Sequence, residues 1–255
     1  MPDRPYVLAE THWKTVDPTP YSVAVLPWGA TEAHNYHLPY ATDNIQAERI
    51  SIMAAERAWS QGAKVVVLPT VPFGVNTTQL DIKLTINLNP STQAAVLTDI
   101  VSALEGQGVH KLVIVNGHGG NDFRQMIREL QPKTKVFLSL VNWWSSVDVK
   151  QWIEESGDHA GEAETAAMMY LVPELVRPLS DAGSGHARAS RLRGVREGWA
   201  WAPRRWTQVT ADTGIGNPSK ATAEKGEAYV GAAVERIASF FVEVAELDLN
   251  QLYED

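Results

Sequence analysis

The sequence predicts an α/β protein in which a mostly parallel central sheet lies between two layers of helices. Four short apolar runs rich in β-branched residues have the composition of buried strands, at residues 22–27, 64–69, 111–115 and 135–141. Segments with helical spacing separate them. Strands that alternate with helices pair in parallel, and the helices then cover both faces of the sheet. At 255 residues and 44% hydrophobic composition, the chain is expected to form one domain over residues 1–255.

Helices are expected between and after these strands, at residues 43–59, 91–107, 123–130 and 220–245. Asp43 stands where an N-cap would be, and Gly108 follows the second helix as a C-terminal signal. A short strand is expected at residues 84–88. From 178 to 218 the regular pattern weakens, which predicts long functional loops or an oligomer arm.

Composition excludes several classes of function. The net charge is −8 and no basic run exists, so no nucleic-acid partner is expected. The arginines of residues 188–196 can form a solvated face, an oligomer contact or a phosphate site. Without cysteine there is neither a disulfide framework nor a thiolate metal site. No signal core or membrane-spanning apolar run is found, so a cytoplasmic protein with no membrane partner is expected.

Three short segments carry most of the candidate functional residues, at 32–43, 116–121 and 158–165. Together they hold four of the seven histidines and five carboxylates. Each lies after or close to an expected strand, and parallel sheets bind ligands beyond the carboxyl ends of their strands. Imidazole and carboxylate groups delivered from several strand ends are ligands for divalent metals, and a shared carboxylate would allow two ions. The segments therefore predict a metal-dependent hydrolase.

Single residues in these segments leave alternatives open. Glu32 and His34 are two apart and project to the same side of an extended segment. Asp43 is either a helix cap or a ligand, and His34 taken alone could be a hydrogen-bonded loop residue. His118 lies between glycines, which favours a ligand. His159 is either a general acid/base or a capping or buried histidine.

Four further polar residues have expected supporting roles. Asn116 and Asn121 are expected to brace the loop around His118 by side-chain hydrogen bonds. Glu162 and Glu164 point in different directions if a helix begins near them. One of these two carboxylates is therefore expected to cap, pair or contact a neighbouring subunit.

The three segments resemble signatures of the creatininase (creatinine amidohydrolase) family. The matches are Glu-x-His-x-x-His-Leu-Pro-x-x-Thr-Asp at 32–43, Asn-Gly-His-Gly-Gly-Asn at 116–121 and His-Ala-Gly-Glu-x-Glu-Thr at 159–165. Their order and spacing agree over about residues 20–230. The resemblance implies a three-layer α/β/α fold, commonly a hexamer, with two divalent metal ions per subunit, zinc or manganese, or else iron or nickel.

The resemblance also implies roles for single residues. One metal would be held by Glu32, Asp43 and His118. The other would be held by His34, the bridging Asp43 and a further glutamate. Creatininase has that glutamate where this chain has Gly120, so the expected replacement is Glu162. His159 aligns with the family's catalytic histidine.

Two departures from the family pattern argue against creatinine as the substrate. Asn35-Tyr36 replaces the usual Gly-Pro and is expected to place an aromatic ring beside the metals. The pair Gly119-Gly120 also differs from creatininase itself. The expected substrate contacts are Tyr36, His37, Trp143 and Trp144, although a core or interface role for the two tryptophans is an open alternative.

The expected reaction is hydrolysis of a cyclic amide, or of an amide or formamide, in a small polar molecule. A metal-bridging hydroxide would attack the carbonyl, and His159 would protonate the leaving group. The alternative within the family is opening of an oxidised cyclitol or sugar-like ring beside a ketone. An alternative of another class is a catalytically inactive, metal-dependent binding protein.

Tryptophans in irregular segments predict a homo-oligomer, most simply a hexamer. The relevant residues are Trp143, Trp144, Trp199, Trp201 and Trp206. A monomer would leave apolar surface exposed there, unless the rings fold back on their own domain.

Overall fold

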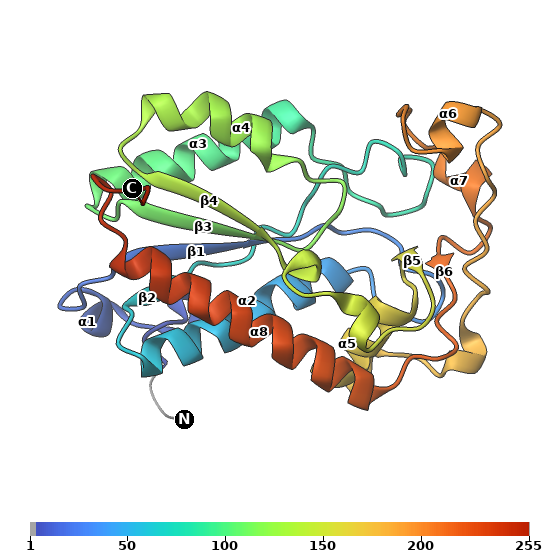
Figure 1. The fold of residues 1–255 in the computed structure, drawn as a ribbon, viewed down its shortest axis with the longest axis horizontal. Helices are drawn as coiled ribbons and strands as arrows, with labels where there is room; N and C mark the ends of the chain where they lie inside the picture. The colour runs from blue at the N-terminus through green and yellow to red at the C-terminus, as the bar shows by residue number, and fades with distance from the viewer. Residues whose placement is uncertain (1–3, 255) are drawn as a thin grey trace.

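The computed structural model describes residues 4–254 and contains the expected parallel sheet between two helical layers (Figure 1). Four parallel strands lie in the order β2-β1-β3-β4. They are β1 (Val23–Trp28), β2 (Val65–Val67), β3 (Lys111–Asn116) and β4 (Phe137–Asn142). All four were predicted from their apolar runs.

Helices cover both faces of this sheet. In Figure 1, α2 (Thr42–Ser60) and α8 (Ala223–Glu246) lie on one face, and α3 (Pro90–Gly106) and α4 (Phe123–Leu130) lie on the other. Successive residues of β1 alternate between the two cores. Val23 and Val25 pack with α2 and α8, whereas Ala24 and Leu26 pack with α3 and α4. Burial on both faces explains why the strands are continuously apolar.

The strand ends form one edge on which the site is built. In the pairing register, Trp28 of β1 lies opposite Asn116 of β3, and Asn116 lies opposite Asn142 of β4. Beyond this edge lie α5 (Glu162–Leu171) and a small antiparallel pair, β5 (Gly157–His159) with β6 (Ile215–Gly216) (Figure 1). Loops and helix starts from distant parts of the chain therefore meet here.

Close packing of α8 on α5 fixes the position of the α5 helix. A Cβ atom at Gly226 would lie 1.9 Å from the carbonyl oxygen of Ala166, so only glycine permits this approach. The Thr222 side chain caps α8 by accepting a hydrogen bond from the Lys225 amide at 3.2 Å. The first turn of α5 is thereby held at the sheet edge.

The remaining elements are short. The α-helices are α1 (Trp13–Val16), α6 (Arg193–Arg196) and α7 (Trp206–Val209). The 3-10 turns are Leu8–Glu10, Gln131–Lys133, Trp143–Ser145, Val149–Gln151, Pro173–Leu175 and Leu179–Asp181. The strand predicted at 84–88 is absent from the structure. This segment makes only single bridges, Thr31 to Ile86 and Gly74 to Asn87. Within residues 4–254, no helix combines the length and apolarity needed to cross a bilayer.

Candidate metal centre and adjoining cavity

Six acidic and histidine side chains meet in a cluster beyond the ends of β1 and β3. They are Glu32, His34, Asp43, His118, His159 and Glu164. Three overlapping sets each bring their ligand atoms within 4.8 Å of one another. The sets are Glu32 with Asp43 and His118, then His34 with Asp43 and Glu164, and finally Glu32 with His34 and His159. Asp43 belongs to the first two sets and therefore lies between them.

Asp43 is not a helix cap. Helix α2 begins at Thr42, and its N-cap residue Ala41 makes no side-chain cap. The Asp43 carboxylate instead lies 3.1 Å from Nε2 of His34 and 3.0 Å from Nδ1 of His118. The first turn of α2 thus presents this carboxylate to the cluster.

The same kind of hydrogen bond orients each of the three histidines of the cluster. In each ring, one nitrogen contacts a backbone carbonyl oxygen. The contacts are His34 Nδ1 to Glu32 at 3.2 Å, His118 Nε2 to Val75 at 3.1 Å, and His159 Nε2 to Ala33 at 2.8 Å. A carbonyl only accepts hydrogen bonds, so these nitrogens carry the hydrogen. The other nitrogen of each neutral ring presents a lone pair to the cluster, as in metal-ligating histidines.

The donor set of this cluster fits a cation. Nδ1 of His118 lies 2.8 Å from Oε1 of Glu32 and 3.0 Å from Oδ2 of Asp43. Among residues 4–254, these two oxygens have no hydrogen-bond donor. Glu32 and Asp43 are 0% and 1% exposed. A buried carboxylate oxygen that receives no hydrogen bond is disfavoured, so a metal between these two oxygens would stabilise them.

Without a metal, the negative charge of the carboxylates favours protonation of the neighbouring side chains. Burial favours a neutral ring, but the Asp43 carboxylate outweighs it and raises the pKa of His34 to about 10. Glu32 and Asp43 likewise hold the pKa of buried His118 well above its ordinary value. Burial raises the pKa of the Glu164 carboxyl. The cluster therefore attracts positive charge whether a proton or a metal supplies it.

The structure places Glu164, and not Glu162, beside His34 and Asp43, which corrects the expected ligand set. The Glu162 carboxylate points away, with Oε1 2.6 Å from Nζ of Lys225. Its other oxygen accepts hydrogen bonds from the backbone amides of Glu154 and Glu155 at 3.0 and 2.7 Å. Glu162 is therefore the carboxylate that pairs and anchors the preceding loop.

Helix geometry explains this exchange of roles. Helix α5 has Gly161 as its N-cap, so Glu162 is the first helical residue and Glu164 the third. A glutamate in the third position reaches back past the helix start, and Glu164 accepts a hydrogen bond from the Ala160 amide. Ala160 has a φ of +50°, which turns the chain sharply between His159 and the helix.

The surroundings of Gly120 leave no room for a glutamate at the position where creatininase has one. The further carboxylate therefore comes from α5. A Cβ at this position would lie 2.3 Å from the Val75 carbonyl oxygen and 2.4 Å from Nε2 of His118. No side chain fits there without moving the His118 ring.

The predicted bracing of the His118 loop is confirmed. Asn116 accepts a hydrogen bond from the His118 amide at 3.1 Å, and Asn121 accepts one from the Val75 amide at 3.0 Å. Gln79 was missed by the sequence analysis. It is buried and donates to Oε2 of Glu32 from a loop distant in sequence, where no local signal marks it.

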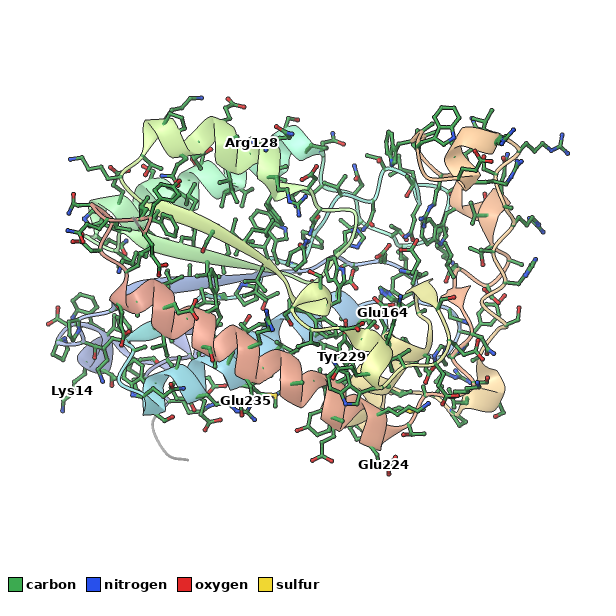
Figure 2. All side chains as sticks on the ribbon, viewed as in Figure 1. Lys14, Arg128, Glu164, Glu224, Tyr229 and Glu235 are labelled. Carbon is green, nitrogen blue, oxygen red and sulfur yellow. The ribbon has the colours of Figure 1, made fainter. Side chains whose placement is uncertain are left out.

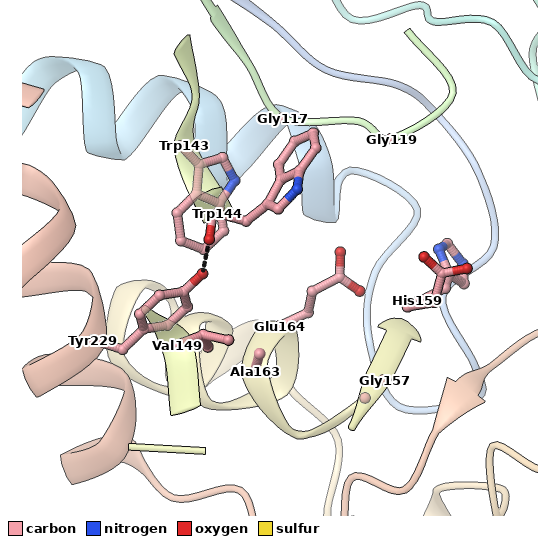
Figure 3. A pocket seen from close by; sticks show the side chains of 12 residues that line it. Gly117, Gly119, Trp143, Trp144, Val149, Gly157, His159, Ala163, Glu164 and Tyr229 are labelled. Atoms are coloured by element: carbon pink, nitrogen blue, oxygen red, sulfur yellow. Dashed lines mark hydrogen bonds between the residues drawn. The ribbon is translucent and has the colours of Figure 1, made fainter. Parts of the chain in front are cut away.

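A cavity of about 290 Å³ adjoins the cluster (Figure 3). The side chains around it include His159, Glu164, Trp143, Trp144, Val149 and Tyr229. In Figure 2, Glu164 and Tyr229 are labelled within the outline of the molecule, whereas Lys14 and Glu224 lie at its edge. The tryptophan pair borders the cavity, and Trp143, which is 1% exposed, also packs in the core. Contact of the two rings with a substrate stays a prediction. Tyr229 donates to the Trp144 carbonyl at 3.1 Å and was not foreseen from the sequence.

Two expected substrate contacts lie outside this cavity. Tyr36 is 58% exposed, and its hydroxyl donates to the Ala211 carbonyl at 3.3 Å. His37 is buried elsewhere, with Nε2 2.8 Å from the Thr165 hydroxyl. The turn at Asn35, which has a φ of +54°, directs Tyr36 away from the cluster. The Tyr36 ring therefore lies at the surface and not in the cavity beside the cluster.

The irregular segment near residues 188–206 contributes one ring to the centre. Trp206 is 6% exposed and meets the His159 ring edge-on at a centroid distance of 5.2 Å. The His34 ring also contacts His159, with a centroid distance of 4.1 Å and an angle of 31° between the ring planes. Trp199 and Trp201 are exposed instead. The arginine side chains in this segment include Arg204, which pairs with Asp158 at the cavity.

Known proteins share this sequence pattern and fold. Residues 9–241 match the family model of creatininase, described as creatinine amidohydrolase. A mycofactocin precursor peptide peptidase from Mycobacterium ulcerans is 26% identical over 232 residues, which cover 87% of this chain and 85% of that protein.

Solved structures of other proteins share the fold of this chain. A Bacteroides fragilis NCTC 9343 protein, named only provisionally as a creatinine amidohydrolase, is 44% identical with a TM-score of 0.93. The match covers 99% of this chain and 100% of the other. A structure named creatininase Mn has a TM-score of 0.80, with coverage of 95% and 99%. At 23% identity, this second likeness shows the fold alone.

Proposed function

This chain belongs to the creatininase family of metal-dependent hydrolases, and from that premise we propose that it hydrolyses an amide bond in a small molecule at a two-metal centre. The observation that carries the proposal is the buried cluster in which three carboxylates face the lone-pair nitrogens of three histidines. Two overlapping ligand sets share Asp43, which supports two ions rather than one.

The residues of each metal site follow from the two sets. Glu32, Asp43 and His118 would hold one divalent ion. His34, Asp43 and Glu164 would hold the other. Nitrogen and carboxylate ligands without thiolates suit zinc or manganese. When bound, such ions polarise a carbonyl and lower the pKa of a coordinated water to about 7.

His159 is placed to move the proton in this reaction. Its Nε2–H is tied to the Ala33 carbonyl at 2.8 Å, so Nδ1 is the nitrogen free to exchange a proton. That nitrogen lies 3.8 Å from Oε1 of Glu32, at the side of the cluster that borders the cavity. The rings of Trp206 and His34 both contact the His159 ring. We infer that Nδ1 of His159 first accepts a proton from the attacking water and then delivers it to the leaving nitrogen of the amide.

The names of the relatives favour a carbon–nitrogen bond as the target. An amidohydrolase and a peptidase both cleave amide bonds, and neither name refers to ring opening beside a ketone. Cyclic amides, formamides and the terminal amide of a short peptide all remain within this class. A cavity of about 290 Å³ holds a small molecule or one residue of a peptide.

Metal analysis and a substrate panel test the proposal. Protein purified without chelator should bind about two equivalents of zinc or manganese. In a panel that includes creatinine and dehydro-inososes, the loaded enzyme should hydrolyse formamidopyrimidines or acylated dipeptides. His159→Ala should keep both ions and lose roughly 10²–10⁴ in kcat. Less than one equivalent after metal addition would refute the centre. Turnover of a dehydro-inosose alone would refute amide hydrolysis, and unchanged kcat in His159→Ala would refute the role of that residue.

A further inference from the structure

The two carboxylate oxygens of Glu32 have different surroundings. Oε1 lies 2.8 Å from Nδ1 of His118 and 3.8 Å from Nδ1 of His159, and no donor within residues 4–254 gives it a hydrogen bond. Oε2 accepts a hydrogen bond from the side-chain amide of Gln79, which lies 47 residues later in the chain. One oxygen of Glu32 therefore faces the histidines of the cluster, and the other is held by a residue outside it.

Gln79 is a buried side chain whose polar contact is with Glu32. It is 2% exposed, and its Nε2 donates to the Glu32 carboxylate. An ionised carboxylate only accepts hydrogen bonds, so the amide presents its NH₂ group to Glu32 and its oxygen elsewhere. Oε1 of Gln79 then has no donor within residues 4–254. Burying an amide oxygen without a donor costs free energy, so packing does not explain a glutamine here, whereas the contact with Glu32 does.

The loop segment that carries Gln79, residues 75–79, also contacts His118. Nε2 of His118 donates to the Val75 carbonyl at 3.1 Å. The backbone amide of Gln79 donates to the Asn76 carbonyl at 3.0 Å, which closes the turn between the two contact points. One short segment therefore supplies hydrogen-bond partners to two members of the same candidate ligand set.

We propose that Gln79 is a positioning residue for one of the two metal sites: by holding Oε2 of Glu32, it keeps Oε1 directed at the ion that His118 would also hold. This inference rests on the proposed two-metal function and adds to it a residue that is not itself a ligand. In the described part of the chain, no hydrogen bond joins residues 75–79 to His34 or Glu164. The effect of Gln79 therefore falls on one site and spares the other.

Gln79→Met is the variant that isolates this hydrogen bond, because it keeps a long unbranched side chain and removes the donor. Without the donor, the Glu32 carboxylate is free to rotate, and metal binding must then order it. Loss of such a hydrogen bond behind a metal ligand typically weakens metal binding about 10- to 100-fold. The zinc dissociation constant of one site should rise by about tenfold or more, while that of the other site changes by less than about threefold.

Zinc titrations in two single-site backgrounds locate the effect. Glu164→Gln leaves the site that contains Glu32 and His118, and adding Gln79→Met there should weaken zinc binding by about tenfold or more. His118→Ala leaves the other site, and the same added change should keep the dissociation constant within about threefold. Competition with a chromophoric chelator measures both constants without any assay of activity.

Gln131→Met is the matched control. The Gln131 side chain donates to the Val136 carbonyl and accepts from the Leu138 amide, both at 2.9 Å, at the start of β4 and away from the cluster. Its loss removes two hydrogen bonds and should leave both zinc constants unchanged. An equal loss of affinity in both backgrounds, no loss in either, or the same loss in Gln131→Met would overturn the role of Gln79.

Two further outcomes are distinguishable from these. If wild-type protein takes up no zinc or manganese, the two-metal function fails and this inference fails with it. If thermal unfolding shows that Gln79→Met does not fold, Gln79→Asn replaces it, because it keeps a polar side chain and withdraws the amide from Glu32 by one carbon. Gln79→Asn should show the same loss confined to one site, and wild-type affinity at both sites would overturn the proposal.

Discussion

Glu162 and Glu164 lie two residues apart in the first turn of α5, yet their carboxylates serve different parts of the molecule. Glu162 pairs with Lys225 of α8 at 2.6 Å and accepts two backbone amides. Glu164 lies within 4.8 Å of the ligand atoms of His34 and Asp43. One turn of helix thus joins the scaffold to the candidate metal centre, and single substitutions can separate the two tasks.

Glu164→Gln should lower the metal content from about two equivalents to about one, because an amide is a poor ligand for zinc or manganese. Glu162→Gln should keep both ions and lose about 1–3 kcal/mol of unfolding free energy, because Lys225 and two amides lose a charged acceptor. Elemental analysis and urea unfolding measure the two effects. Two full equivalents in Glu164→Gln would contradict the assignment.

Gly120→Ala should weaken metal binding although it adds only one methyl group. The new Cβ would lie 2.4 Å from Nε2 of His118 and would force the ring away from Glu32 and Asp43. We expect at least a tenfold rise in the zinc dissociation constant, measured by competition with a chromophoric chelator. Gly106→Ala is the control, since its Cβ has open space. Equal affinities in the two variants would show that the loop relaxes freely.

The exposed and buried tryptophans of the irregular segment should behave differently. Trp206 is 6% exposed, contacts His159 and donates to the Thr213 carbonyl at 2.9 Å. Trp206→Ala should therefore cost about 3–5 kcal/mol of stability and lower kcat. Trp199→Ala and Trp201→Ala change side chains that are 74% and 85% exposed, and should shift the stability of a protomer by less than about 0.5 kcal/mol.

The same two variants test assembly. We expect a homo-oligomer, most simply a hexamer, in which the exposed rings of Trp199 and Trp201 are covered. Light scattering should show wild-type protein well above the 28.0 kDa of one chain. Trp199→Ala with Trp201→Ala should shift it toward smaller species. A stable monomer of the metal-loaded wild-type protein would reject this expectation.

His37 should make the metal-free protein less stable as the pH falls. Burial, and then the neighbouring His34, lower the pKa of His37 from 6.5 to about 4. The folded state therefore disfavours the charged ring. Its contribution is complete above pH 6.5 and is lost as the pH falls toward 4. Between pH 7 and 4.5, wild-type protein should lose about 2 kcal/mol more unfolding free energy than His37→Gln.

Urea unfolding of chelator-treated protein at the two pH values measures this difference. The comparison with His37→Gln removes contributions from other titrating groups, because both proteins share them. Identical losses in the two proteins would mean that His37 is not held neutral in the fold.

The local hydrophobic pattern of the sequence predicted the four strands of the central sheet. The four strands were readable because each is buried on both faces and therefore continuously apolar. The segment at 84–88 was wrongly predicted as a strand, because an alternating pattern does not reveal whether a neighbouring edge is available for pairing. Side-chain direction was harder to predict than element type. The tight turn at Asn35, with a φ of +54°, sent Tyr36 outward.

The sequence by itself determined the parallel α/β frame and the residues whose chemistry suits a metal centre, since apolar period and motif spacing are local properties. Only the tertiary structure decided which carboxylate joins that centre. The choice of Glu164 over Glu162 depends on where α5 begins, on Lys225 of a helix some sixty residues later, and on the Val75 carbonyl that excludes a side chain at Gly120. These contacts join residues far apart in the chain, and no local pattern encodes them.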